Sequence, residues 1–267
     1  WPKLVSSLPG MRKRPPWHYE GDAAKRELNR FFGTRDLGGF GVDGMNLAIA
    51  AAGCLLGYVE ETQKSALPHL TGMAVESASE TIALDAATRR NLELDTHPSG
   101  RIEHTLLGVL DETVTPMGAR ALRRWLTRPL RSRQALRRRH QAIGMLIDSR
   151  RHESLREQLR GIGDLERILA RVALRSSRPR DLSTLRDGLA AAPKLREQIA
   201  TLDSPLLHTL VESIGDHADT AALLARAIVE QPPVLQRDGG VVADGYDTEL
   251  DELRRLSTHA DQYLVEL

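Results

Sequence analysis

Apolar side chains recur every three or four positions along most of this chain, a spacing typical of amphipathic helices and not of strands. Near the start of the chain the pattern predicts helices over 22–32 and 45–64. Beyond Gly100 it predicts an almost wholly helical region. The helices expected there cover 116–128, 132–149, 163–172 and 217–229, with three shorter ones punctuated by Pro179, Pro193 and Pro205.

The same periodicity predicts which side chains face the core. In the helix 45–64 the predicted buried face holds Leu47, Ala51, Cys54, Leu55 and Tyr58. The predicted buried faces of three later helices are as follows: Leu122, Trp125 and Leu126 in the helix 116–128; Leu136, Ile143 and Ile147 in the helix 132–149; and Ile162, Leu165, Leu169 and Val172 in and just before the helix 163–172. Thr115 followed by Pro116 predicts a capped helix start, and Pro129 predicts its end.

Short apolar runs predict a small amount of β structure. Residues 37–42 form a candidate strand bent by glycines, and 73–76 and 81–84 are two more. Residues 234–242 are typical of a hairpin, because Asp238-Gly239-Gly240 supplies the positive φ angles of a tight turn. The expected fold class is mainly α: a helical core domain with a small α/β piece at the N-terminus, which has too few strands to close its own sheet.

The last segment, 247–267, predicts a single lever-like helix. Its apolar seam is heptad-like and runs to the last residue, with no Gly, Asn or Pro after it. The chain also begins at Trp1, without Met, in a proline-rich stretch. We therefore expect a piece of a longer protein; the alternative is a natural C-terminal helix that simply ends. The seam consists of Leu250, Leu253, Ser257, Ala260, Leu264 and Leu267.

Composition narrows the class of protein. Of the 267 residues, 41% are hydrophobic and 27% charged, which is typical of a soluble globular chain of one or two domains. An aromatic share of 4% argues against a stacking platform for single-stranded nucleic acid. The single cysteine, Cys54, excludes an internal disulfide framework. No apolar run approaches the roughly 20 residues of a membrane span, and there is no signal peptide, so the expected location is cytoplasmic.

Positive charge is concentrated in one part of the chain. Residues 101–180 hold 19 Arg and 8 Asp or Glu, whereas the whole chain has a net charge of +1. This block predicts a candidate DNA-backbone surface at Arg123, Arg124, Arg137, Arg138 and Arg139. The favoured alternative is that these arginines cover helix surfaces and pair with carboxylates, since helical arginine alone reads no bases.

Motifs for catalysis are absent from the sequence. There is no Gly-Lys pair and hence no P-loop, and no histidine follows a Glu by three positions. His152-Glu153 could begin the zinc-binding motif His-Glu-x-x-His, but Arg156 stands where that motif needs its second histidine. Asp216 is expected to cap a helix with His217 exposed, and Cys54 to be a packed thiol. The sequence therefore predicts no catalytic, cofactor-binding or metal-ligating residues.

Four stretches together resemble the MutS family of DNA mismatch-repair proteins, and in their order and spacing they cover nearly the whole chain. They are Arg14-Pro-Pro-Trp-His-Tyr-Glu20 with Phe32-Gly-Thr-Arg-Asp-Leu37; Asp85-Ala-Ala-Thr-Arg-Arg-Asn-Leu-Glu93; Thr115-Pro-Met-Gly-x-Arg-x-Leu-x-x-Trp-Leu126; and Gly163-Asp-Leu-Glu-Arg-Ile-Leu-Ala-Arg171 with Arg178-Pro-Arg-Asp-Leu182 and Asp238-Gly-Gly-Val-Val-Ala-Asp-Gly-Tyr246.

The resemblance implies a fragment of a bacterial protein. Residues 1–68 would be the C-terminal part of an RNase H-like connector domain, 69–246 the helical core domain, and 247–267 the start of a lever helix leading to an absent clamp. The family's mismatch-reading domain and ATPase would lie outside this chain, so no active-site residue carries over and the fragment is expected not to be an enzyme. The intact cytoplasmic protein would be a homodimer that binds mismatched double-stranded DNA, ATP and Mg, with other mismatch-repair proteins as further partners and no membrane.

The expected role is that of a structural and allosteric core segment, which links mismatch binding to the ATPase. One alternative is a paralogue acting on recombination structures; the connector-like segment 14–62 argues against those paralogues that lack a connector. Another is an autonomous helical interaction module with an Arg-rich docking or DNA-backbone surface. Such a module should have closed ends, which this sequence does not show.

Overall fold

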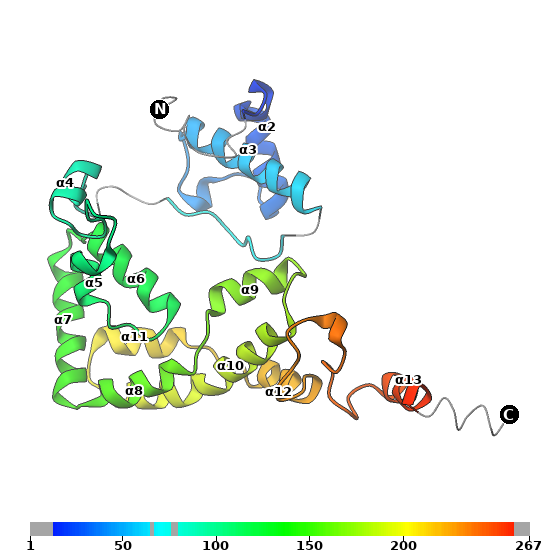
Figure 1. Ribbon diagram of the computed structural model, residues 1–267. Coiled ribbons are helices and arrows are strands. Elements are labelled where there is room, and N and C mark those ends of the chain that lie inside the picture. The colour runs from blue at the N-terminus through cyan, green and yellow to red at the C-terminus, as the bar shows by residue number, and fades with distance from the viewer. Residues whose placement is uncertain (1–12, 65–66, 76–79, 259–267) are drawn as a thin grey trace, which may run out of the picture. The chain divides into compact units, whose positions relative to one another are not determined.

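The computed structural model describes residues 13–64, 67–75 and 80–258. The chain divides into two compact units, Trp1–Ser77 and Ala78–Leu267 (Figure 1). The domain boundary expected after residue 68 stays a prediction. No helix in the described part of the chain combines the length and the apolar character needed to cross a bilayer.

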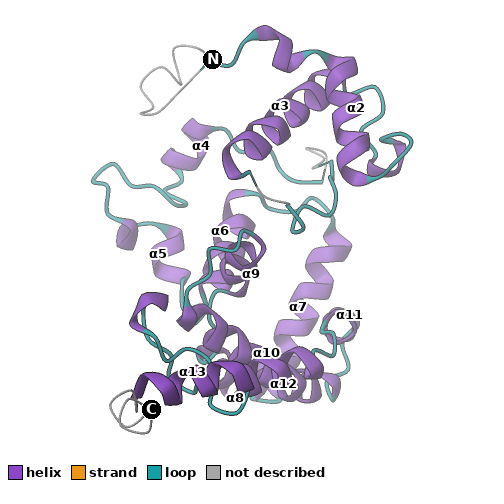
Figure 2. Ribbon diagram, turned by 90° about the vertical axis from the view of Figure 1, so that its right-hand side faces the viewer, coloured by secondary structure: helices purple, strands orange, loops and turns teal. Residues whose placement is uncertain are grey.

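The first unit is built on two helices, α2 (Gly21–Phe32) and α3 (Asn46–Gln63), which lie side by side in both views (Figures 1 and 2). Glu20 starts α2, because its carboxylate accepts hydrogen bonds from the backbone N–H groups of Asp22 and Ala23 at 3.1 and 2.6 Å. Gly33 ends α2 with a φ of 67°. Two 3-10 helices, η1 (Pro16–Tyr19) and η2 (Gly38–Phe40), complete the unit.

The strand predicted over 37–42 is wrong, and the described part of this unit contains no strand. The Asp36 carboxylate accepts the N–H of Gly38 at 2.9 Å, and Gly41 and Gly44 have φ values of 70° and 76°. These features turn the backbone away from the extended conformation. Residues 73–75 are not a strand either, and the rest of the predicted strand 73–76 lies outside the described residues.

The predicted buried face of α3 is also wrong in part. Leu47, Ala51, Leu55 and Tyr58 are exposed, whereas Cys54 is buried as expected. This helix is apolar nearly all round, so its periodicity cannot select one face; the contacts with α2 and η1 select it instead. The side that they cover holds Ile49, Gly53, Cys54 and Leu56.

The second unit is helical, which confirms the mainly α fold class (Figure 2). The longest helix, α10, contacts α8, α9, α11 and α12. The elements are α4 (Ala86–Asn91), η3 (Ile102–His104), α5 (Leu106–Leu110), α6 (Pro116–Thr127), α7 (Arg133–Asp148), α8 (Arg151–Arg160), α9 (Leu165–Ala173), α10 (Pro179–Ala200), α11 (Pro205–Ser213), α12 (Ala218–Ala227), η4 (Gln236–Asp238) and α13 (Thr248–Thr258).

Local signals placed several helix ends correctly. The Thr115 hydroxyl accepts the N–H of Gly118 at 3.0 Å, and α6 ends at Thr127, before Pro129. Pro193 does not end a helix, contrary to the prediction, because α10 continues through it. An interior proline costs about 3 kcal/mol of helix stability, and the packing of α10 against four other helices offsets that cost.

The core of the second unit consists of small clusters rather than the predicted stripes. Ala142 is buried in α7 while Ile143 and Ile147 are exposed, and in α9 Ile168 is buried while Leu169 is exposed. Val172 of α9 and Trp125 of α6, both predicted to be buried, are exposed as well. The two clusters share Leu146 and Ile199 at their edges, and their buried members are Ala142, Leu202 and Leu207 in one, and Leu155, Ile162 and Leu195 in the other.

The hairpin predicted over 234–242 does not form. Gly239 and Gly240 do have positive φ values of 72° and 66°, but they follow the 3-10 helix η4. The segment after them pairs with the end of α12 instead: Val242 forms an isolated antiparallel bridge with Ile228. The strand predicted over 81–84 is likewise reduced to one bridge, between Thr81 and Leu130.

The helix predicted over 247–267 begins as α13, which is described up to Thr258, and its role as a lever stays a prediction. Two residues of its predicted seam, Leu253 and Ser257, are exposed, and Leu253 is 56% exposed. The remaining seam positions beyond Thr258, which are Ala260, Leu264 and Leu267, lie outside the described residues.

Candidate functional site

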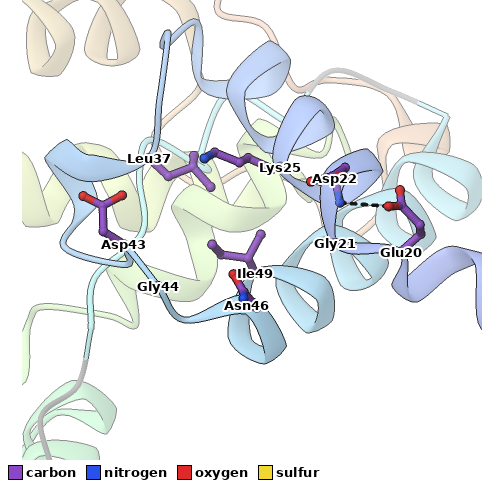
Figure 3. Close-up of a pocket in the computed structure, with 9 residues that line it drawn as sticks. All are labelled: Glu20, Gly21, Asp22, Lys25, Leu37, Asp43, Gly44, Asn46 and Ile49. Carbon is purple, nitrogen blue, oxygen red and sulfur yellow. Dashed lines mark hydrogen bonds between the residues drawn. The ribbon is translucent and has the colours of Figure 1, made fainter.

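Among the described residues, the first feature that could form a site is a cavity of about 350 Å³ in the first unit (Figure 3). Its polar lining includes Asp22, Lys25 and Asp43, and the Glu20 carboxylate there is occupied in capping α2. In the part of the chain that the structure describes, no three His, Cys, Asp or Glu side chains are grouped to hold a metal ion.

The second feature is a series of arginine contacts in the second unit, which begins between α6 and α9. Both terminal nitrogens of Arg120 donate to the Asp164 carboxylate at 2.7 Å, and one donates to Glu166 at 2.5 Å. Asp164 also caps α9 by accepting the N–H of Arg167. The hydrogen bonds from Arg120 hold the pKa of Asp164 below its ordinary value. This carboxylate therefore joins two helices in its charged form.

A second bidentate pair connects α9 to α10. Arg171 donates through Nε and Nη2 to Asp181 at 2.7 and 2.6 Å. Asp181 also accepts the backbone N–H of Arg178 at 2.9 Å, at the start of α10. The hydrogen bonds from Arg171 lower the pKa of Asp181. Paired donors on a planar guanidinium fix the orientation of both partners more strictly than a single contact does.

From α10 the contacts pass to the segment that follows α12. Arg186 donates to the backbone carbonyl oxygens of Val229 and Glu230 at 3.3 and 3.2 Å. Its side chain is only 14% exposed, and Asp187 accepts from its Nε at 2.9 Å. Nearer the start of the same helix, Arg180 donates to the carbonyl of Pro232 at 3.4 Å. The long helix α10 thus holds the segment at the end of α12.

The last contacts reach α13. The N–H of Val229 donates to the carbonyl of Val241 at 3.1 Å, beside the bridge between Ile228 and Val242. Arg254 of α13 donates to the Val242 carbonyl at 2.8 Å and to Asp244 at 2.7 Å. The first turns of α13 are therefore held against the segment that α12 and α10 hold.

We call this series the arginine framework: Arg120, Arg171, Arg186 and Arg254 with the carboxylates and carbonyls that they contact. Together with the backbone hydrogen bond from Val229 to Val241, it connects α6 through α9 and α10 to α13. The pattern of residues along the chain does not predict these pairs. Arg120 and Asp164 are 44 positions apart, and no spacing rule connects residues at that separation.

The five arginines predicted as a DNA-backbone surface do not behave alike. Arg123 pairs with Asp95 at 3.1 Å, and the Arg139 guanidinium stacks over the Trp125 ring at 3.9 Å. Arg124, Arg137 and Arg138 are exposed and have no carboxylate within ion-pair distance among the described residues. Pairing with carboxylates thus holds for Arg123 and not for these three.

His217 and Cys54 are placed as predicted, whereas Asp216 lies one position before the N-cap of α12, which is His217. The Asp216 carboxylate accepts the N–H of Ala218 at 3.0 Å at the start of α12, and His217 is exposed. Cys54 is a free, buried thiol.

Comparison with protein families gives two matches, one for each end of the chain. Residues 2–71 match the family model described as MutS domain II, and residues 87–267 match the one described as MutS domain III. The second match covers more than half of the chain and contains the whole arginine framework.

Proposed function

Because this chain belongs to the MutS family and has a part in mismatch repair as MutS domains II and III, we propose that it links mismatch binding to ATP turnover and performs no catalytic step itself. The observation that carries the proposal is the arginine framework. It gives α13, at one end of the second unit, a continuous series of contacts to α6. A change in the direction of α13 therefore has a defined route into the helical body.

The arginine framework contributes more to the orientation of α13 than to the folding stability of the chain. Exposed ion pairs contribute only about 0–1 kcal/mol each, so Arg254 with Asp244, whose carboxylate is 95% exposed, adds little to folding. Its second bond, to the Val242 carbonyl, fixes where the helix begins. Coupling between distant sites requires packed elements with discrete arrangements, and a helix anchored at one end by specific hydrogen bonds is such an element.

In the intact protein we place ATP and Mg outside this chain. The sequence has no Gly-Lys pair for a phosphate-binding loop, and the described residues provide no group of metal ligands. Mismatched double-stranded DNA and a second copy of the protein are the partners of the intact molecule under this proposal. The present segment supplies the connection between their sites.

The proposal is tested in a full-length MutS protein that contains this chain. Arg254→Ala removes the hydrogen bonds that anchor α13 to Val242 and Asp244, and we expect the stimulation of ATP turnover by mismatched duplex to fall several-fold while basal turnover persists. Arg237→Ala is the matched control, since Arg237 is 83% exposed and lies outside the framework. Unchanged stimulation in the Arg254 variant would contradict the coupling role.

A second variant separates loss of coupling from loss of folding. Asp244→Ala removes one partner of Arg254 and leaves its bond to the Val242 carbonyl in place. We expect a smaller loss of stimulation than in Arg254→Ala, with the thermal unfolding temperature of the wild-type protein. A loss of stimulation that follows the unfolding temperature across both variants would show a folding effect and overturn the proposal.

A further inference from the structure

The corner between α6 and α7 has an unusual concentration of one charge. Residues 123–139 contain eight arginines and no Asp or Glu, in a chain whose net charge is +1. The corner consists of the end of α6, the connection 128–132 and the first turns of α7. We call it the arginine corner.

Three of these eight arginines are already engaged. Arg123 pairs with Asp95, Arg139 stacks on Trp125, and Arg128 has a partner as well. The others are exposed, and in the described part of the chain no carboxylate lies within 4.0 Å of their side-chain nitrogens. These five are Arg124, Arg131, Arg133, Arg137 and Arg138. The corner therefore presents uncompensated positive charge.

The backbone that carries these arginines is held in place. The N–H of Ile82 donates to the Pro129 carbonyl at 2.8 Å, and the N–H of Arg131 donates to the Glu80 carbonyl at 2.9 Å. The stacking of Arg139 on Trp125 fixes the start of α7 against the end of α6. The cations are thus brought together before any partner binds, which lowers the ordering cost of binding.

We propose that the arginine corner binds the phosphate backbone of double-stranded DNA, independently of base sequence. A duplex carries one negative charge per about 1.7 Å of its axis, which matches a dense cluster of arginines. Protein interfaces centre on aromatic or apolar anchors, whereas Trp125, the one aromatic residue of 123–139, is 46% exposed but has a ring face covered by the Arg139 guanidinium. Successive arginines of α7 point about 100° apart, so they contact phosphates rather than insert together into a groove.

The test uses this chain and fluorescence anisotropy with a matched duplex over a range of salt concentrations. The triple variant Arg124→Gln/Arg137→Gln/Arg138→Gln is compared with Arg196→Gln/Arg226→Gln/Arg237→Gln, which removes the same charge outside the corner. The slope of log affinity against log salt should fall by about 0.9 for each phosphate that is no longer neutralised, or by about 2.7 for the corner variant. The control slope should stay close to that of the wild type.

Neighbouring residues provide a sharper control. Arg124→Gln should weaken binding, whereas Arg123→Gln, the same change one position earlier, should have less effect because Arg123 is engaged with Asp95. Circular dichroism melting identifies any variant that fails to fold. No measurable binding by the chain, an unchanged slope in the corner variant, or equal competition by poly-glutamate would each overturn the proposal.

Discussion

Gly53 of α3 meets Ala24 of α2 so closely that a side chain on the glycine has no room. A Cβ built on Gly53 would lie 2.5 Å from the Cβ and 2.8 Å from the Cα of Ala24. The two helices of the first unit therefore touch through their backbones at this point. The match between a glycine and an alanine that are distant in the sequence sets the distance between α2 and α3.

Gly53→Ala should accordingly destabilise the first unit, because the added methyl forces the helices apart. We expect a loss of about 1–3 kcal/mol in the free energy of unfolding, measured by urea denaturation. Gly57→Ala in the same helix is the control: apart from its chain neighbours and its own helix backbone, no described atom lies within 4 Å of the added Cβ, so the higher helix propensity of alanine should stabilise the unit by up to about 1 kcal/mol. Equal effects at the two positions would argue against the close contact.

The stability of the second unit should depend on pH through Asp181. Its pKa is lowered in the folded state by the hydrogen bonds from Arg171, so the folded state binds this proton less readily than the unfolded chain. The stabilisation is present above the unfolded pKa of about 3.9 and is lost as the pH falls through the lower folded value. Asp181→Asn should reduce the urea midpoint at neutral pH, and the difference from wild type should shrink in acid. A difference that stays constant with pH would contradict the ion pair.

The stiffness of α13 should matter for coupling in the intact protein. Leu253→Gly/Leu256→Gly weakens the helix by about 1 kcal/mol at each position and should uncouple ATP turnover from mismatch binding. Leu253→Ala/Leu256→Ala shortens the same side chains but keeps the helix, and should preserve coupling if stiffness is what matters. Coupling that survives the glycine pair would count directly against a lever role. Failure of coupling in both pairs would show that the leucine side chains themselves are required.

The helix starts of this protein could be predicted because they depend on neighbouring residues. Thr115 caps α6 through Gly118, three positions on, whereas Asp216, which was predicted to cap α12, lies one position before the N-cap His217 and accepts the N–H of Ala218. The positive φ values at Gly239 and Gly240 were predicted for the same reason, although the hairpin expected around them does not form. Hydrogen bonds and backbone conformations at this range are set by the local sequence.

Features that depend on distant segments could not be predicted in the same way. Ile143 suits a core better than Ala142, but α7 buries Ala142 because the cluster with Leu202 and Leu207 lies on that side. Pro193 is a helix breaker by sequence, yet the surrounding helices keep α10 continuous.

The arginines show most directly which features the sequence determines and which only the tertiary structure decides. The sequence alone determined the family, the mainly helical fold and the position of the positive block, since all three follow from residue types and their order. Only the tertiary structure distinguished Arg123 from Arg124, because Asp95, 28 positions away, reaches one and not the other. An ion pair depends on which side chains folding brings within a few ångströms, and the linear order of residues does not specify that distance.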